Sequence, residues 1–161
     1  MKLHVGCGGT RKEGYVNIEA KNAVAADVKC NALDLDKIYK PETIDEIYTS
    51  HMFEHLDRRE AVKFLNICTK LLKKGGVLFM AIPCIDYIVD DWKAGIYDDH
   101  RFIAVLYGLH RDPYDYHKMG YTKETIVEKI KEYGFVIEKT ERGRPGYGPN
   151  SPGIMIWAKK Q

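Results

Sequence analysis

The sequence lacks any apolar run of membrane length, since no part of its 161 residues approaches the roughly 20 apolar residues that a spanning helix needs. The chain starts Met1-Lys2-Leu3-His4-Val5 and enters a strand pattern at once, without the apolar region of a signal peptide. A long block of Lys and Arg is also missing, and the net charge is only +2. These absences argue against a membrane span and give no electrostatic reason to expect nucleic-acid binding.

Cysteine is scarce, and the spacing of the four residues excludes a paired motif. Cys7, Cys30, Cys68 and Cys84 include no Cys-x-x-Cys pair, which is the arrangement that zinc knuckles and redox centres use. We therefore expect reduced thiols in a cytoplasmic protein, and no bound metal ion.

The composition is that of one folded domain. Hydrophobic residues make up 45% and charged residues 30% of the chain, and neither a repeat nor a linker divides it. We predict a single domain over residues 1–161. Strand patterns occur at Leu3–Cys7, Tyr15–Ala20, Asp27–Asn31, Ile44–Ser50, Val77–Ile82, Phe135–Thr140 and Ile154–Lys159.

Helical patterns fall between the later strands. Arg58–Lys73 carries apolar residues at helical spacing and ends in lysines followed by Gly75. Thr122–Tyr133 begins at a capping threonine with Thr125 at the third position, and Arg101–Leu109 is a short candidate. Strands that alternate with helices predict a parallel α/β sheet whose ligand lies at the carboxyl ends of the strands.

The first half of the chain has too little sequence for covering helices. Only residues 7–14 separate the first two strands, and only residues 21–26 the next two, whereas a crossover that contains a helix needs about 10–12 residues or more. Leu3 and Val5 alternate with polar neighbours, as in a strand with one exposed face. Either loops cover this face, or a second copy of the chain covers it in a homodimer.

A glycine-rich segment, Gly6-Cys7-Gly8-Gly9, ends the first strand, and Glu19 ends the second. Glycines let a ligand approach the backbone closely, and a carboxylate at the end of the second strand can accept hydrogen bonds from both hydroxyls of a ribose. A dinucleotide site would need a glycine where Arg11 stands, followed by a helix, and the sequence has no Gly-Lys-Ser or Gly-Lys-Thr of a phosphate loop. The pattern favours a nucleoside cofactor without phosphate, such as S-adenosylmethionine.

Four segments, in this order, resemble the class I S-adenosylmethionine-dependent methyltransferases, in particular a compact type often found among cell-surface glycan genes. Leu3–Gly9 is similar to the family motif around the methionine part, and Gly14–Glu19 to the motif that ends in an acidic residue. Asp27–Leu33 resembles the stretch around adenine, and Leu71–Gly76 the turn before the fifth strand. The resemblance covers nearly the whole chain. It implies a Rossmann-like sheet of order 3-2-1-4-5-7-6 with the last strand antiparallel.

The resemblance also implies which residues bind the cofactor. Asn31 stands where the family usually has Asp, and its carbonyl can still accept a bond from the adenine amino group. The methyl donor and its acceptor would meet at the carboxyl end of the fourth strand. The cofactor-binding residues expected from this are Gly6, Cys7, Gly8, Glu19, Asn31, Ala32, Ser50 and His51.

The stretch His51-Met52-Phe53-Glu54-His55 allows two interpretations. As His-x-x-Glu-His it matches a signature of some zinc peptidases, but a strand precedes it and no third ligand stands out, so a zinc hydrolase is the less favoured alternative. In a methyltransferase, Glu54 and His55 would face the pocket with His55 as a candidate general base, and His117 is a second candidate. Glu54 and His55 could instead only hold the loop by hydrogen bonds.

Residues 84–121 form a connection too long for a simple link and are rich in aromatic and charged side chains. We expect a lid that shapes the acceptor pocket, where aromatic faces suit sugar rings. The sequence therefore predicts methyl transfer from S-adenosylmethionine to a small-molecule or glycan-type acceptor. The alternative is a regulatory or partner module that binds the cofactor without catalysis.

Overall fold

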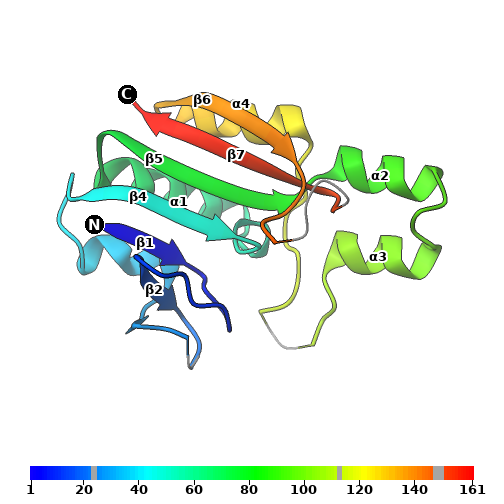
Figure 1. The fold of residues 1–161 in the computed structure, drawn as a ribbon, viewed down its shortest axis with the longest axis horizontal. Helices are drawn as coiled ribbons and strands as arrows, with labels where there is room; N and C mark the ends of the chain where they lie inside the picture. The colour runs from blue at the N-terminus through cyan, green and yellow to red at the C-terminus, as the bar shows by residue number, and fades with distance from the viewer. Residues whose placement is uncertain (23–24, 112–113, 147–150) are drawn as a thin grey trace.

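The centre of the fold is one seven-stranded sheet (Figure 1). The computed structural model describes residues 1–22, 25–111, 114–146 and 151–161. Its strands are β1 (Lys2–Val5), β2 (Val16–Glu19), β3 (Val28–Lys29), β4 (Ile44–Ser50), β5 (Leu72–Pro83), β6 (Phe135–Arg142) and β7 (Gly153–Lys160). Their order is β3-β2-β1-β4-β5-β7-β6, and β7 is antiparallel to both of its neighbours. This topology confirms the Rossmann-like methyltransferase sheet expected from the sequence.

The helices of the described residues lie on one side of this sheet or beyond its end. They are α1 (Arg58–Leu71), α2 (Ile85–Lys93), α3 (Asp99–Tyr107) and α4 (Lys123–Glu132), with short 3-10 helices η1 (Ala32–Lys37) and η2 (Phe53–His55). In Figure 1, α1 and α4 lie behind the sheet, while α2 and α3 extend past it as neighbours. None of the described helices reaches the length and apolarity required to span a bilayer.

The hydrophobic core lies between the sheet and helix α1. Asp57 caps this helix through a capping box with Glu60, and the apolar stripe that follows includes Phe64 and Leu65, both fully buried. Leu3 of β1 is equally buried, so the strand presents its apolar side to the helix. The core therefore fixes the sheet from one face and leaves the carboxyl ends of β1, β2 and β4 open.

The opposite face of the sheet carries aromatic side chains and no described helix. Tyr48 and Phe79 stack with ring centroids 4.6 Å apart, and Trp157 packs edge-on against Phe79 at 5.0 Å. His4 approaches Tyr48 at 5.0 Å, and the ammonium group of Lys12 lies 4.4 Å from the centre of the Tyr48 ring. The first strands thus have no described helix on this face, although α1 covers the other one, and the expectation of reduced helices in the N-terminal half is confirmed for the described residues.

Strands β3 and β5 and two of the helices differ from the sequence-based expectation, since β3 spans only Val28–Lys29 and β5 begins at Leu72. Helix α1 ends at Leu71 rather than Lys73, because the N–H groups of Glu42 and Thr43 bind its last carbonyls at 3.1 Å and β5 begins at once. Helix α2, between Ile85 and Lys93, was not predicted. Its single buried apolar residue, Ile88, is accompanied by a buried Asp91, which weakens the apolar stripe that identifies a helix.

Candidate functional site

The glycine loop leaves β1 in a conformation that its glycines require. The N–H groups of Gly6 and Cys7 donate to the carbonyl of Ile18 at 2.9 and 3.0 Å, which fastens the loop to β2. Gly6 and Gly8 have φ values of 71° and 54°, in the left-handed region that glycine adopts readily. A Cβ on Gly6 would lie 2.6 Å from Cγ of Met52, whereas a Cβ on Gly8 would meet nothing within 4 Å. Gly8 therefore leaves open space for a ligand beside the backbone.

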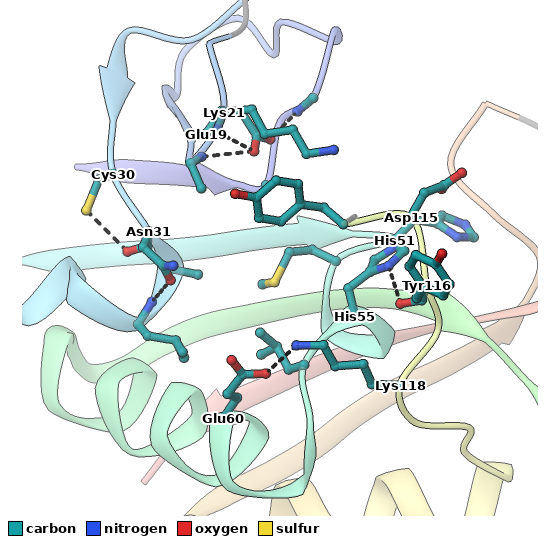
Figure 2. A pocket seen from close by; sticks show the side chains of 18 of the residues that line it. Glu19, Lys21, Cys30, Asn31, His51, His55, Glu60, Asp115, Tyr116 and Lys118 are labelled. Carbon is teal, nitrogen blue, oxygen red and sulfur yellow. Dashed lines mark hydrogen bonds and ion pairs between the residues drawn. The ribbon is translucent and has the colours of Figure 1, made fainter. Parts of the chain in front are cut away.

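Three backbone N–H groups orient the carboxylate of Glu19. Gly8 donates to Oε2 at 2.8 Å, while Ala20 and Lys21 donate to Oε1 at 2.9 and 3.2 Å. A carboxylate has about four acceptor positions, so Glu19 can still accept bonds from ligand hydroxyls. Figure 2 shows this side chain at the wall of a pocket.

The pocket is a cavity of about 490 Å³ at the carboxyl ends of the strands. Several residues predicted to bind the cofactor line it together, namely Gly6, Gly8, Glu19, Asn31, Ala32 and His51. Cys7 and Ser50 are not among the lining residues, and the Cys7 side chain is buried beneath the loop. Met52 and Leu56, which give the cavity apolar surface, were not predicted from the sequence. Each is an isolated hydrophobic residue there, without a pattern that marks it as part of a site.

Asn31 has a structural task besides any contact with a ligand. It is the N-cap of η1, and its side-chain oxygen accepts the N–H of Leu33 at 2.9 Å. The same oxygen is the acceptor that the sequence comparison assigned to adenine. An amide oxygen has two lone pairs, so the two bonds are compatible.

The lining residues fit S-adenosylmethionine better than a phosphate-bearing cofactor. An anionic carboxylate suits a ribose diol, and the volume lies in the range of about 300–1,000 Å³ typical of small-molecule sites. Between Gly6 and Asn22 the described residues form no helix, so the loop has no helix N-terminus to receive a pyrophosphate. Met52 and Leu56 offer apolar surface to a base or a methionine chain.

His51 stands at the end of β4 with an unusual backbone. Its φ is 54°, which is uncommon for a residue that has a Cβ, and its N–H donates to the carbonyl of Ala81 at 2.9 Å. Residues in such conformations persist where neighbouring contacts hold them, and they concentrate at functional sites. Nδ1 of His51 lies 3.1 Å from Oε1 of Glu54, so the two side chains form an ion pair when the imidazole is protonated.

Glu54, His55 and His117 form a polar cluster beside this cavity. The N–H groups of Lys118 and Met119 donate to the carbonyl of Glu54 at 2.9 and 3.2 Å, which holds the segment before α4 against η2. The rings of His55 and His117 meet edge-on with centroids 5.0 Å apart. One ligand atom from each of the three residues lies within 4.8 Å of the others. The two candidate bases named from the sequence are therefore neighbours.

The His-x-x-Glu-His stretch does not lie on one helix. His51 belongs to the turn after β4, and η2 spans only Phe53–His55, so the two histidines of the motif do not share a helical face. The zinc-peptidase interpretation needs that shared face. The residue that joins Glu54 and His55 is His117, from a segment far along the chain.

Burial and charge set the protonation states in this cluster. Burial acts to raise the pKa of Glu54, but contact with His51 and the charges of His51 and His55 outweigh it, so the pKa is lowered. Burial lowers the pKa of His117. Burial, together with the charge of Glu54, raises the pKa of Tyr121 to about 12. At neutral pH the cluster therefore holds an ionised Glu54 and a neutral His117.

Comparisons with known proteins agree with this geometry. Residues 3–80 match the family described as "Methyltransferase domain". A Burkholderia thailandensis 1,6-didemethyltoxoflavin-N1-methyltransferase, solved with S-adenosylhomocysteine, has a TM-score of 0.67 at 13% identity over 99% of this chain and 70% of its own. A methyltransferase from Archaeoglobus fulgidus scores 0.66 at 17% identity, over 99% of this chain and 85% of its own. At these identities the likeness is one of fold. No curated protein sequence gives a significant match.

Residues 3–80 thus match the methyltransferase domain, and the described residues have the Rossmann-like fold of class I methyltransferases. These findings confirm the enzyme class expected from the sequence, an S-adenosylmethionine-dependent methyltransferase, and with it the cofactor. The acceptor is a separate question, which the chemistry of the cavity must answer.

Proposed function

We propose that this protein transfers the methyl group of S-adenosylmethionine to a small-molecule or glycan-type acceptor. The observation that carries the proposal is the Glu19 carboxylate, oriented by three N–H groups at the wall of a cavity that continues to His55 and Tyr116. Such a cavity has one end suited to a nucleoside and another lined by aromatic and imidazole groups. The two substrates of a methyl transfer need such neighbouring sites.

Each cofactor-binding residue has a role in this proposal. The backbone of Gly6, Cys7 and Gly8 would hold the methionine part, and Glu19 would bind the ribose hydroxyls. Asn31 and Ala32 would border adenine. Because the thiol of Cys7 is buried, this residue would act through its backbone alone. Ser50 and His51, at the end of β4, would lie near the transferred methyl group.

His55 is the proposed acceptor of the substrate proton. Its Nδ1 lies 2.9 Å from the carbonyl of Tyr116, which can only accept, so Nδ1 carries the proton and Nε2 keeps a lone pair. His117 is the second candidate, and Glu54 would stabilise an imidazolium formed beside it. S-adenosylmethionine supplies an already electrophilic methyl group, so these residues need only position the acceptor and remove its proton.

The acceptor side of the cavity suits a flat or ring-shaped molecule. Tyr114 and Tyr116 line it and are 63% and 45% exposed, although His110 stacks on the Tyr116 ring and the Lys21 ammonium lies 4.7 Å from the centre of the Tyr114 ring. The remaining exposed surface of these rings offers apolar contact to an acceptor. The Burkholderia thailandensis protein was solved with bound 1,6-didemethyltoxoflavin, a small molecule, which supports an acceptor of similar size. A sugar ring is the other candidate, because aromatic faces pack against its C–H groups.

The aromatic sheet face supports a homodimer. Tyr48, Phe79 and Trp157 form this face without a covering helix among the described residues. Phe79 is only 4% exposed in the single chain and the other two rings are half-buried, so a second copy would cover what remains of their surface. Sedimentation that finds only monomer at micromolar concentration would oppose this assignment. The four cysteines are free, which agrees with the proposed cytoplasmic location.

Calorimetry of the purified protein tests the proposal. S-adenosylmethionine and S-adenosylhomocysteine should bind with micromolar affinity, whereas NAD and ATP should not. Mass spectrometry of small-molecule and sugar acceptors should then detect a transferred methyl group. Cofactor binding without product across such a panel would favour the regulatory module, and failure to bind either cofactor form would overturn the proposal.

A further inference from the structure

Several buried polar atoms around Glu54 have no hydrogen-bond partner among the residues that the structure describes. They are Oε2 of Glu54, Nε2 of His51 and the hydroxyl of Tyr121, while Oε1 of Glu54 has the contact with Nδ1 of His51 at 3.1 Å. Glu54 is only 2% exposed. A buried carboxylate with one oxygen left without a donor is costly, and native proteins satisfy such groups with water or an ion. The cluster therefore has the electrostatic character of a cation site.

The two histidines beside Glu54 are oriented as metal ligands commonly are. Nδ1 of His55 lies 2.9 Å from the carbonyl of Tyr116, and Nδ1 of His117 lies 3.2 Å from the carbonyl of Leu106. A carbonyl only accepts, so both Nδ1 atoms are protonated and both Nε2 atoms keep a lone pair. Metal-binding histidines usually donate their second N–H in this way, which fixes the tautomer and the ring.

We propose that Glu54, His55 and His117 bind one divalent transition-metal ion. Two imidazoles and one carboxylate form a donor set that suits Zn²⁺ and similar first-row ions, whereas Mg²⁺ prefers oxygen ligands throughout. His51 holds the ligating carboxylate in place through its contact with Oε1. The sequence pattern around His51–His55 shows no third ligand, because His117 lies far along the chain and tertiary bonds such as those from Lys118 and Met119 to Glu54 bring it to the site.

The three ligand atoms lie close enough together to hold one ion after a small movement. They are within 4.8 Å of one another, whereas metal–ligand bonds of about 2.1 Å place tetrahedral ligands about 3.5 Å apart. Binding therefore draws the three side chains inward. Of the three residues, His55 also lines the cavity, so the site borders the proposed acceptor side. An ion held there would be close enough to that side to bind an oxygen of the acceptor.

Metal binding does not depend on the proposed function, although it changes the role of His55. With an ion bound, Nε2 of His55 is a ligand and not a base, and the ion itself lowers the pKa of a coordinated hydroxyl. Metal binding is measured without S-adenosylmethionine or acceptor. Binding of the cofactor without binding of metal would contradict only the metal site. Binding of metal without binding of the cofactor would contradict only the proposed function.

The test uses the 161-residue chain without an affinity tag, freed of metal by a chelator. Calorimetry with Zn²⁺ should give one site per chain, and Mg²⁺ should not compete. His55→Gln and His117→Gln should each weaken Zn²⁺ binding by about 100-fold or more. His100→Gln is the matched control, because His100 is exposed on α3 and is not one of the three clustered residues. Circular dichroism of every variant checks that the fold is retained.

Proton NMR of the Co²⁺-loaded protein gives a second readout that needs no variant. Each ligand histidine should contribute one exchangeable Nδ1–H signal shifted by the paramagnetic ion, so the wild-type protein should show two. Loss of one signal in folded His117→Gln would support the assignment. Absence of Zn²⁺ binding by the folded wild-type chain, or unchanged binding in both glutamine variants, would overturn it.

Discussion

The carboxylate of Glu19 accepts the backbone N–H of Gly8 at 2.8 Å, which ties the end of β2 to the glycine loop at the wall of the cavity. Glu19 is thus both a proposed ligand for the ribose and a support for the loop. Glu19→Ala should weaken binding of S-adenosylmethionine by about 100-fold, since bonds to a charged acceptor contribute about 1.5–3 kcal/mol each. Calorimetry measures this loss directly.

Two variants separate the roles of Glu19. Glu19→Gln keeps one side-chain oxygen that can accept an N–H, but its NH2 group faces the N–H groups that the other oxygen accepted, so it should lose less thermal stability than Glu19→Ala while cofactor affinity falls. Glu13→Ala removes an exposed carboxylate close by in sequence and should leave affinity unchanged. Equal affinity of Glu19→Ala and the wild type would remove Glu19 from the cofactor site.

Gly6 is predicted to tolerate no side chain. Its φ of 71° disfavours any residue with a Cβ, and the added atom would lie 2.6 Å from Cγ of Met52. Gly6→Ala should therefore destabilise the fold by about 2 kcal/mol or more. Gly9→Ala is the matched control, because a Cβ on Gly9 would meet nothing within 4 Å. Chemical denaturation of both variants checks the difference, and similar midpoints would contradict this reading of the loop.

Local patterns predicted the elements whose signals are local. The strand Ile44–Ser50 and the Thr122–Thr125 capping box are present as expected, because apolar alternation and capping chemistry are written in neighbouring residues. Helix η1 was missed, since its Asn31 cap had been interpreted only as a cofactor ligand. Because Asn31 is both a helix cap and a proposed cofactor ligand, interpreting it as a ligand hid the start of the helix.

The polar cluster could be predicted only in part. His55 and His117 were each named as a candidate base, yet nothing in the sequence indicates that they touch. Their contact depends on the carbonyl of Glu54, which accepts two N–H groups from the segment before α4, and on the pairing of Cys84 with Tyr121. Such tertiary bonds between distant backbone groups leave no periodic pattern, so the contact is a product of the fold.

Asp27 makes stability depend on pH in the acid range. Its carboxylate accepts the backbone N–H and the amide of Asn17 at 2.9 and 3.0 Å and pairs with Arg11 at 2.7 Å. These contacts, of which the backbone bond from Asn17 has the largest effect, lower the pKa of Asp27 from its usual 3.8 to about 2. Because the folded value lies below the unfolded one, this stabilisation is complete above the unfolded value and is lost as pH falls toward about 2.

Asp27→Asn should therefore melt at a lower temperature than the wild type at neutral pH. The difference should shrink as pH falls from about 4 to about 2, because the wild-type carboxyl then becomes protonated and is neutral, like the amide of the variant. Asp90→Asn, on the exposed surface of α2, is the control and should change the melting temperature little at any pH. A difference between Asp27→Asn and the wild type that stays constant across this range would show that the carboxylate charge is not the cause.

Asp91 and Arg142 form an ion pair that joins α2 to β6. The Asp91 side chain is 4% exposed and that of Arg142 is 35% exposed, and the Arg142 guanidinium also lies 4.9 Å from the centre of the Tyr87 ring. Arg142→Met leaves a buried carboxylate without its cation, which costs about 3–5 kcal/mol when both partners are buried. Because Arg142 is partly hydrated, we expect a loss of about 2–3 kcal/mol.

A double-mutant cycle separates the ion pair from the packing of Arg142 against Tyr87. Asp91→Asn in the Arg142→Met background removes the unpaired charge, so it should restore part of the stability lost in the single variant. The recovered part measures the penalty of the lone carboxylate, and the remainder measures lost ring packing. Denaturant unfolding of the four proteins gives both values. Strictly additive losses would mean that the pair contributes nothing of its own, and that α2 is held to β6 by the contact between Arg142 and Tyr87 instead.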